Sequence, residues 1–230
     1  MFMCLSNILY PYLSIFRPMT RTLKLYDEDH YIKEFKAKVI SITNNLVELD
    51  QTAFFPESGG QAGDTGTIEG EPVVDTVIEG ETIKHVMKEK PCFHLDDTVS
   101  GVIDWKRRYR IMKLHTASHI MEYFLWSEFG YMRRMGSHVD DVKDRADYLH
   151  EERLDPEKLR KVEEDTNIFL MEGHHVVITV DDEGIRHWSC GPVEMNCAGT
   201  HVRNTKEIGS IKLKRRNPGR GEERVETSLT

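Results

Sequence analysis

The longest helical pattern in this chain runs over residues 105–129, and it carries His115 and His119 four positions apart. Asp104 in front of it is a suitable N-cap, and Gly130 behind it is a suitable C-terminal cap residue, so the pattern predicts one long helix. Residues i and i+4 lie on the same face of a helix, where two imidazoles can reach one metal ion. A histidine pair alone is weak support for a metal site, because this chain has 11 histidines.

A second pair with the same spacing, Cys197 and His201, strengthens the metal hypothesis. The small residues Ala198 and Gly199 between them let the chain turn both side chains toward one point. Three imidazoles and one thiolate match the preference of Zn²⁺, whereas Mg²⁺ and Ca²⁺ prefer oxygen. We therefore predict one Zn²⁺ per chain, bound by His115, His119, Cys197 and His201. Cys190 is a competing ligand, which we interpret as a buried apolar thiol.

Before the predicted helix, short β-branched runs alternate with turn residues, a pattern typical of a small barrel or curled sheet. The predicted strands are residues 37–42, 46–50, 73–78, 82–87 and 98–103. Residues 54–66 contain four glycines and cannot form a packed strand or helix. After the long helix we expect a second helix from Asp155 to Gly173, and strands at residues 175–180 and 210–214. The predicted fold class is α+β, with a small N-terminal β-barrel-like domain before the metal-binding part.

The charges are segregated along the sequence, with an acidic block at residues 140–165 and a basic strip near the C-terminus. The strip includes Lys212, Lys214, Arg215 and Arg216. Charge runs are usually solvated faces, and we interpret both runs first in that way. The net charge of −8 argues against general coating of nucleic acid, but the strip is suited to a local run of phosphates.

The composition and the number of cysteines indicate the environment in which we expect the protein to work. With 39% hydrophobic and 30% charged residues the chain is typical of a globular protein, so we expect no membrane partner. Four cysteines are too few for a disulfide scaffold, so we expect a reducing, cytoplasmic location. Residues 1–18 are apolar, but they lack a basic start and contain Pro11, so they are a poor signal peptide and remain an unassigned extension.

Four motifs in chain order resemble the editing domain of alanyl-tRNA synthetases. They are the glycine-rich residues 54–66, the histidine-bearing residues 104–119, residues 197–202 (Cys-Ala-Gly-Thr-His-Val), and residues 204–209 with the basic strip behind them. The sequence departs from the family pattern at Ala198, where the family has glycine, and at Tyr148, where the family has phenylalanine. A chain of 230 residues has no room for an ATP-dependent aminoacylation domain, so it resembles the medium-length AlaX-type trans-editing proteins.

The resemblance implies a zinc-dependent aminoacyl-tRNA deacylase, which is a carboxylic ester hydrolase of translation quality control. The implied substrate is the acceptor end of tRNA(Ala) mischarged with serine, or with glycine, and no obligate protein partner is predicted. On this interpretation, residues 19–97 form a glycine-rich β-barrel-like domain and residues 98–230 a zinc-containing editing domain.

The glycine-rich stretch and the basic strip supply the remaining candidate site residues. Gln61 is a candidate catalytic donor, or else a loop residue that hydrogen-bonds its own backbone. The candidate substrate-binding residues are Gly59, Gly60, Ser137, Lys212, Lys214, Arg215 and Arg216. Two other interpretations stay open. One is a non-catalytic tRNA-binding module with structural zinc, because four protein ligands are typical of a closed site, and the other is an editing module of the threonyl-tRNA synthetase type.

Overall fold

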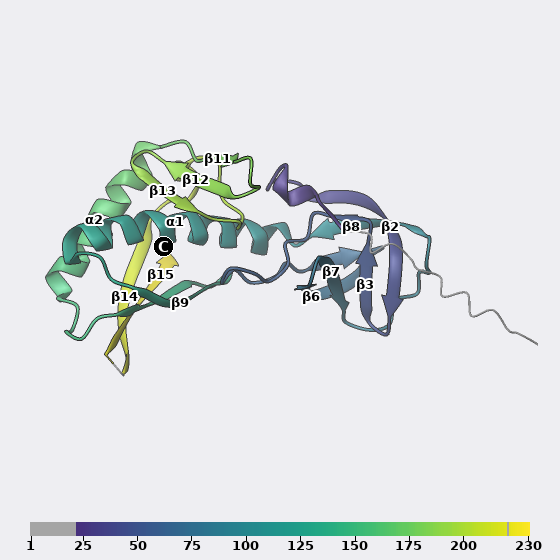
Figure 1. Cartoon of the computed structure of the whole chain (residues 1–230), viewed down its shortest axis with the longest axis horizontal. Helices are drawn as coiled ribbons and strands as arrows, with labels where there is room; N and C mark the ends of the chain where they lie inside the picture. Colours follow the sequence, from purple (N-terminus) through teal and green to yellow (C-terminus); the bar gives the residue numbers. More distant parts are fainter. Residues whose placement is uncertain (1–21, 220) are drawn as a thin grey trace, which may run out of the picture.

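The structure, a computed structural model, describes residues 22–219 and 221–230. The predicted extension of residues 1–18 lies outside this part of the chain. Within it, two α-helices and fifteen strands form an elongated molecule with strands of residues 34–103 at one end and both helices with two further sheets at the other (Figure 1). The predicted α+β class is confirmed. Neither of the helices in these residues is long and apolar enough to cross a membrane.

Six antiparallel strands close on one another at the N-terminal end, in the order β2-β3-β7-β6-β5-β8. Their bounds are Glu34–Thr43 for β2, Leu46–Leu49 for β3, Gly66–Ile68 for β5, Glu71–Glu79 for β6, Thr82–Met87 for β7 and Thr98–Ile103 for β8. Alternate residues point inward, as Val99 and Ile103 do on β8, and fill the interior with aliphatic side chains. Two short strands, β1 (Leu23–Lys24) and β4 (Gln51–Thr52), pair in parallel beside them.

The glycine-rich stretch between β4 and β5 has no helix or extended strand, as predicted, and it connects the six-stranded end to the rest of the molecule. The backbone N–H of Ala62 donates to the carbonyl of Val139 over 3.0 Å, and the N–H of Val139 donates to the carbonyl of Gly60 over 2.8 Å. Gly60 has a φ of +83°, and a Cβ atom there would lie 2.8 Å from the carbonyl oxygen of Ser137. Only glycine permits this close approach.

The long helix α1 (Trp105–Phe129) leads from β8 into the other half of the molecule (Figure 1). Asp104 caps it by accepting a hydrogen bond from the backbone N–H of Arg107 over 3.1 Å, as the sequence predicts. The helix is buried on most sides because the second helix α2 (Pro156–Glu172) and strands from both sheets pack around it. Both helices lie where the sequence predicts them.

Two antiparallel sheets complete this half. The first has the order β14-β15-β10-β9, with bounds Ile211–Gly219, Glu222–Leu229, Asp144–Leu149 and Arg134–Val139, and the second has the order β11-β12-β13, with bounds Val177–Val180, Arg186–Cys190 and Val193–Asn196. Apolar residues of α1, α2 and both sheets share one core, which includes the fully buried Leu125, Leu170, Trp188 and Val225.

The position of β8 bears on the domain boundary. The predicted boundary after residue 97 would assign β8 to the editing domain, whereas the backbone of β8 pairs with β2 and β5 at the N-terminal end. Asp104, the first residue after β8, is the cap of α1.

Candidate metal centre and its cavity

The four predicted ligands converge on one point. His115 and His119 lie on the buried face of α1, and Cys197 and His201 lie in the loop after β13. One ligand atom from each residue lies within 4.8 Å of the others. The Sγ atom of Cys197 lies 3.5 Å from Nε2 of His115 and 3.2 Å from Nε2 of His201. Separations this short suit donors that share one metal ion.

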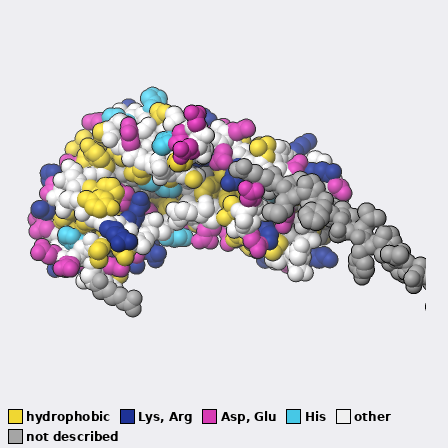
Figure 2. All heavy atoms as spheres, in the orientation of Figure 1, with side chains coloured by type: hydrophobic (Ala, Val, Ile, Leu, Met, Phe, Trp, Pro, Cys, Tyr) yellow, Lys and Arg dark blue, Asp and Glu magenta, His cyan; other side chains and the backbone are white. Residues whose placement is uncertain are grey.

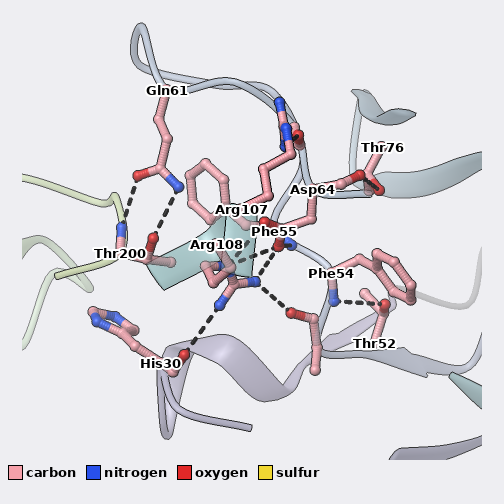
Figure 3. Close-up of polar contacts among 12 residues, drawn as sticks. His30, Thr52, Phe54, Phe55, Gln61, Asp64, Thr76, Arg107, Arg108 and Thr200 are labelled. Atoms are coloured by element: carbon pink, nitrogen blue, oxygen red, sulfur yellow. Dashed lines mark hydrogen bonds and ion pairs between the residues drawn. The ribbon is translucent and has the colours of Figure 1, made fainter. Parts of the chain in front are cut away.

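Gln61 fixes the ring of His115. Nδ1 of His115 lies 2.9 Å from Oε1 of Gln61, and because a carboxamide oxygen only accepts, the ring proton is on Nδ1. The backbone N–H of Thr200 donates to the same oxygen over 2.9 Å, and Nε2 of Gln61 donates to Oγ1 of Thr200 over 2.9 Å, which fixes the amide (Figure 3). His115 therefore presents the lone pair of Nε2 toward Cys197.

Thr116 has the same effect on His201. Oγ1 of Thr116 donates to the carbonyl of Met112 over 2.9 Å, so it accepts from Nδ1 of His201 over 3.2 Å. His201 is thereby left with a free lone pair on Nε2. Hydrogen bonds of this kind at the second ring nitrogen are what orient histidine ligands in metal sites.

His119 completes the group as a buried imidazole without a partner. Neither of its ring nitrogens has a hydrogen-bond partner among the described residues. Its ring packs edge-on against Trp188, with 5.0 Å between ring centroids. A buried polar side chain without a partner is costly and therefore rare. A metal ion shared with His115 and His201 would satisfy it, so the residues present fit a metal ion.

Burial also sets the protonation states that metal binding needs. Burial lowers the pKa of His115 to about 3 and is the largest cause that holds the pKa of His119 and of His201 well below the usual range. The imidazoles are therefore neutral, which is the form that binds metals. Burial raises the pKa of the Cys197 thiol, so a bound cation is needed to stabilise its thiolate.

Gly199 allows the loop to reach the helix. A Cβ atom on Gly199 would lie 2.3 Å from Cε1 of His115 and 2.8 Å from Oε1 of Gln61. Real Cβ atoms do not approach other atoms so closely, so a side chain here would displace the ring of His115 or the amide of Gln61. The spacing of Cys197 and His201 thus depends on glycine between them.

A cavity of about 420 Å³ opens onto His115, His119 and Cys197. Three of the predicted substrate-binding residues, Gly59, Gly60 and Ser137, line the same cavity. Ala198, one of the departures from the family pattern, also lines it and is exposed. The ligands therefore lie at the wall of a space large enough for an amino-acid residue, rather than inside a solid core.

Gln61 has a different position from the one predicted for it. It is fully buried and is not among the residues that line the cavity. Its side chain bonds His115 and Thr200, so it neither points toward the cavity as a donor nor bonds its own backbone.

The basic strip lies away from the cavity. Lys212, Lys214, Arg215 and Arg216 are on β14, and β15 and β10 separate this edge strand from β9 at the cavity. Lys212 pairs with Glu163 over 2.6 Å, Arg215 pairs with Glu223, and Arg216 pairs with Glu226 over 3.4 Å. On the face shown in Figure 2, basic and acidic side chains are interspersed rather than gathered by sign.

Cys190, the competing ligand, is at the end of β12 and is buried in the apolar core. Burial raises the pKa of its thiol to about 11. It is not part of the four-residue group, in agreement with its interpretation as an apolar thiol.

Five polar residues of the cavity wall are not among the site residues predicted from the sequence: Ser58, Ser118, Arg134, Asp144 and Asn196. The interpretation of the acidic block as a solvated face is wrong for Asp144, which is 2% exposed. Asp144, Ala146 and Tyr148 alternate along β10 with their side chains buried, so β pairing turns every second residue of this charged segment inward. This alternation along residues 144–148 is the sequence pattern that could have predicted the buried position of Asp144.

A buried ion pair joins the two ends of the molecule beside the candidate metal centre. Arg108 of α1 pairs with Asp64 of the glycine-rich stretch, and both residues are 1% exposed (Figure 3). The guanidinium also donates to the carbonyl of Ala53 over 2.7 Å and to that of His30 over 3.1 Å. The ring of His30 in turn lies 2.9 Å from the backbone nitrogen of His201.

Two family models match parts of this architecture. Residues 18–107 match the model of class II (A) tRNA synthetases, and residues 189–229 match the second additional domain of threonyl and alanyl tRNA synthetases. The second match includes Cys197 and His201. Together with the fold, they define a protein related to tRNA synthetases and to the additional domain that carries half of the candidate metal centre.

Whole-chain relatives define the family more closely. The chain is 40% identical to the alanyl-tRNA editing protein AlaX-M of Pyrococcus horikoshii over 220 residues, which are 90% of this chain and 98% of the relative. It is 35% identical to the alanine–tRNA ligase of Sulfurisphaera tokodaii and 36% identical to that of Ignicoccus hospitalis, matching 84% of this chain but only 24% of each ligase. The chain belongs to the AlaX family of alanyl-tRNA editing proteins.

Proposed function

We propose that this protein is a zinc-dependent deacylase that hydrolyses the ester of mischarged tRNA(Ala), chiefly seryl-tRNA(Ala). The observation that carries the proposal is the group of three neutral imidazoles and one thiol, with His119 unpartnered, at the wall of a cavity. The AlaX family supplies the class of substrate. One zinc ion per chain, held by His115, His119, Cys197 and His201, fits this donor set.

A zinc ion bound there supplies Lewis-acid chemistry to an ester carbonyl. The chain itself contributes orientation. Gln61 holds His115 and Thr116 holds His201 in the tautomer that leaves Nε2 free. An aminoacyl ester is already activated, so the site needs no strong nucleophile. The glycine-rich stretch brings Gly59 and Gly60 to the cavity, where their small size leaves room for the acceptor end.

Selectivity for serine over alanine follows from the polar wall of the cavity. A site that hydrogen-bonds a hydroxyl rejects an analogue that lacks it, because its own polar groups are then left unpaired. Ser137 lines this cavity and is the residue we propose for contact with the seryl side chain. Glycyl-tRNA(Ala), which has no side chain to contact, is expected to be hydrolysed more slowly.

The test is deacylation of seryl-, glycyl- and alanyl-tRNA(Ala) by the purified protein, before and after removal of zinc by a chelator. We expect rapid hydrolysis of the seryl form, slow hydrolysis of the alanyl form, and loss of activity on chelation that zinc restores. Full activity in a preparation shown by elemental analysis to be free of metal would refute the zinc-dependent mechanism.

Four protein ligands favour a second candidate, a tRNA-binding module in which zinc only stabilises the fold. This candidate predicts tRNA binding without turnover, and a loss of folding when zinc is removed. A protein that stays folded on chelation but stops hydrolysing seryl-tRNA(Ala) excludes it.

We also propose that the two structural parts divide at Asp104 rather than after residue 97. The pairing of β8 with β2 and β5 supports this division, since a strand cut from its partners loses its backbone hydrogen bonds. Limited proteolysis and expression of residues 104–230 alone would test it.

A further inference from the structure

Asp144 is a buried acid that the proposed chemistry leaves without a role. It lines the same cavity as His115, His119 and Cys197 and is 2% exposed. Its Oδ2 atom accepts a hydrogen bond from Oγ of Ser118 over 2.8 Å. Ser118 directly precedes His119 on α1, so this hydroxyl anchors the carboxylate close to the candidate ligands.

The charged groups near Asp144 do not neutralise it fully. Arg134 lines the cavity too, but its guanidinium pairs with Glu122 over 3.3 Å. Glu122 is itself buried and accepts from the hydroxyl of Tyr148 over 3.1 Å. Two buried carboxylates thus share one arginine. Burial is the largest cause that raises the pKa of Asp144 to about 7, and the attraction of Arg134 offsets it only in part.

A buried carboxylate with a hydroxyl as its side-chain partner is stabilised by a cation that enters the cavity. The aminoacyl ester carries such a cation, because its α-ammonium group is bonded to the carbon next to the ester carbonyl. A pose that brings the carbonyl to the ligand group therefore brings the ammonium nitrogen into the cavity as well. The seryl hydroxyl is neutral and would leave the charge of Asp144 uncompensated.

We propose that Asp144, positioned by Ser118, is the subsite that binds the α-ammonium group of the aminoacyl ester. This inference rests on the proposed deacylase function. The ammonium subsite predicts that efficient hydrolysis needs a substrate with a free amino group, so an N-blocked ester such as N-acetyl-seryl-tRNA is a poor substrate. The subsite recognises what all aminoacyl esters share, whereas Ser137 is proposed to recognise the serine side chain.

The experiment compares kcat/KM for seryl-tRNA(Ala) and N-acetyl-seryl-tRNA(Ala) in the native protein and in Asp144→Asn, a variant of nearly the same shape. A hydrogen bond to a charged group contributes enough to change kcat/KM by about 10- to 100-fold. We expect the native protein to prefer the free-amine substrate by this factor. Asp144→Asn should lose this preference by slowing on seryl-tRNA(Ala) while keeping its rate on the N-acetyl substrate.

Two further variants serve as controls. Asp147→Asn changes an acid on the opposite face of β10, which pairs with Arg224, and should leave the preference unchanged. Ser118→Ala should reduce the preference in the same direction as Asp144→Asn but less, and it carries the test if thermal melting shows that Asp144→Asn does not fold.

The outcomes separate the two proposals. If Asp144→Asn slows both substrates equally or neither, the ammonium subsite is refuted and the deacylase function stands. If it changes instead the ratio of seryl to glycyl hydrolysis and keeps the preference for a free amine, Asp144 contacts the serine hydroxyl and the subsite is again refuted. A native protein that hydrolyses no aminoacyl ester overturns the proposed function, and the subsite with it.

Discussion

Two buried polar clusters on α1, one around Arg108 and one around His119 about three turns further on, differ in how completely their hydrogen bonds are satisfied. Around Arg108, the guanidinium donates to Asp64 and to two backbone carbonyls, and Asp64 also accepts from the backbone N–H of Phe55 over 2.6 Å. Around His119, residues 22–219 and 221–230 provide no hydrogen-bond partner for either ring nitrogen. The hydrogen bonds of the first cluster are complete, whereas the second needs a ligand that the described part of the chain does not supply.

This difference assigns the cluster around Arg108 a role in folding and the cluster around His119 a role in ligand binding. A buried charge pair with all its hydrogen bonds fixes how two segments meet, although its net contribution to stability is often small. A buried imidazole without a partner raises the free energy of the folded state until something binds it. Satisfaction of hydrogen bonds, more than burial or charge, thus indicates which of these polar residues face a ligand.

The largest expected effect is on the incomplete cluster. Cys197→Ala should abolish deacylation of seryl-tRNA(Ala) and lower the zinc content well below one ion per chain, because it removes the sulfur ligand. Elemental analysis and a deacylation assay on one preparation measure both. The matched control is Cys190→Ala, which removes a buried thiol outside the group and should keep zinc and activity at a cost of about 1 kcal/mol in stability. Normal zinc content and activity in Cys197→Ala would show that neither metal binding nor deacylation depends on the sulfur ligand, and would contradict the four-ligand site.

The complete cluster should respond through stability. Arg108→Met leaves the carboxylate of Asp64 buried and unpaired, so we expect the free energy of unfolding to fall by about 3 to 5 kcal/mol, measured by urea denaturation. The double variant Arg108→Met, Asp64→Leu removes both charges and should recover much of that loss. Zinc content per folded chain should stay near one in both variants. A loss of zinc at unchanged stability would show that the ion pair of Arg108 and Asp64 contributes to metal binding rather than to folding.

Gln61 orients His115 in the incomplete cluster, and its variant measures how much that orientation contributes to metal binding. Gln61→Ala removes the acceptor at Nδ1 of His115, and loss of such an outer partner typically weakens metal affinity by about 10- to 100-fold. We expect weaker zinc binding together with a slower rate, and recovery of the rate when zinc is added in excess. Gln51→Ala, at a half-buried glutamine that donates to the carbonyl of Lys36, is the control. A slower rate at full zinc occupancy would instead indicate contact of Gln61 with substrate.

The sequence predicted the parts of the fold whose pattern is local. The helical spacing and the caps of α1 and α2 predicted both helices, and β-branched runs predicted five of the six strands that close at the N-terminal end, all except the short β5. Strands β10 and β15 were missed because charged residues occupy their outward faces and pair across strands, as Arg224 does with Asp147. Such pairing stabilises a strand through its neighbour and leaves no apolar run to recognise.

For the candidate site, too, the sequence predicted only the residues that local spacing brings together. The i, i+4 spacing indicated the four ligands, because the spacing itself brings each pair to one side of its segment. The contacts of Gln61 with His115 and of Ser118 with Asp144 join residues 54 and 26 positions apart. No spacing rule encodes contacts of that kind, so the residues that orient the ligands and line the cavity emerged only from the tertiary structure.

The smallest expected effect concerns the basic strip, whose cations resemble Arg108 in that acidic partners already satisfy most of them. Replacing Lys212, Lys214, Arg215 and Arg216 by alanine should weaken tRNA binding if the strip contacts phosphates, and each lost contact would lower the slope of log affinity against log salt by about 0.7 to 0.9. Because Glu163, Glu223 and Glu226 pair with three of the four, we expect a total change in slope of about one rather than three or four. The control is Lys36→Ala, at an exposed lysine of β2. An unchanged slope would show that the strip is a solvated face without contact to tRNA. A change in slope of about three or four would show that tRNA phosphates displace the glutamates. Ion-paired side chains at the surface would then still bind a ligand, unlike the buried pair of Arg108 and Asp64.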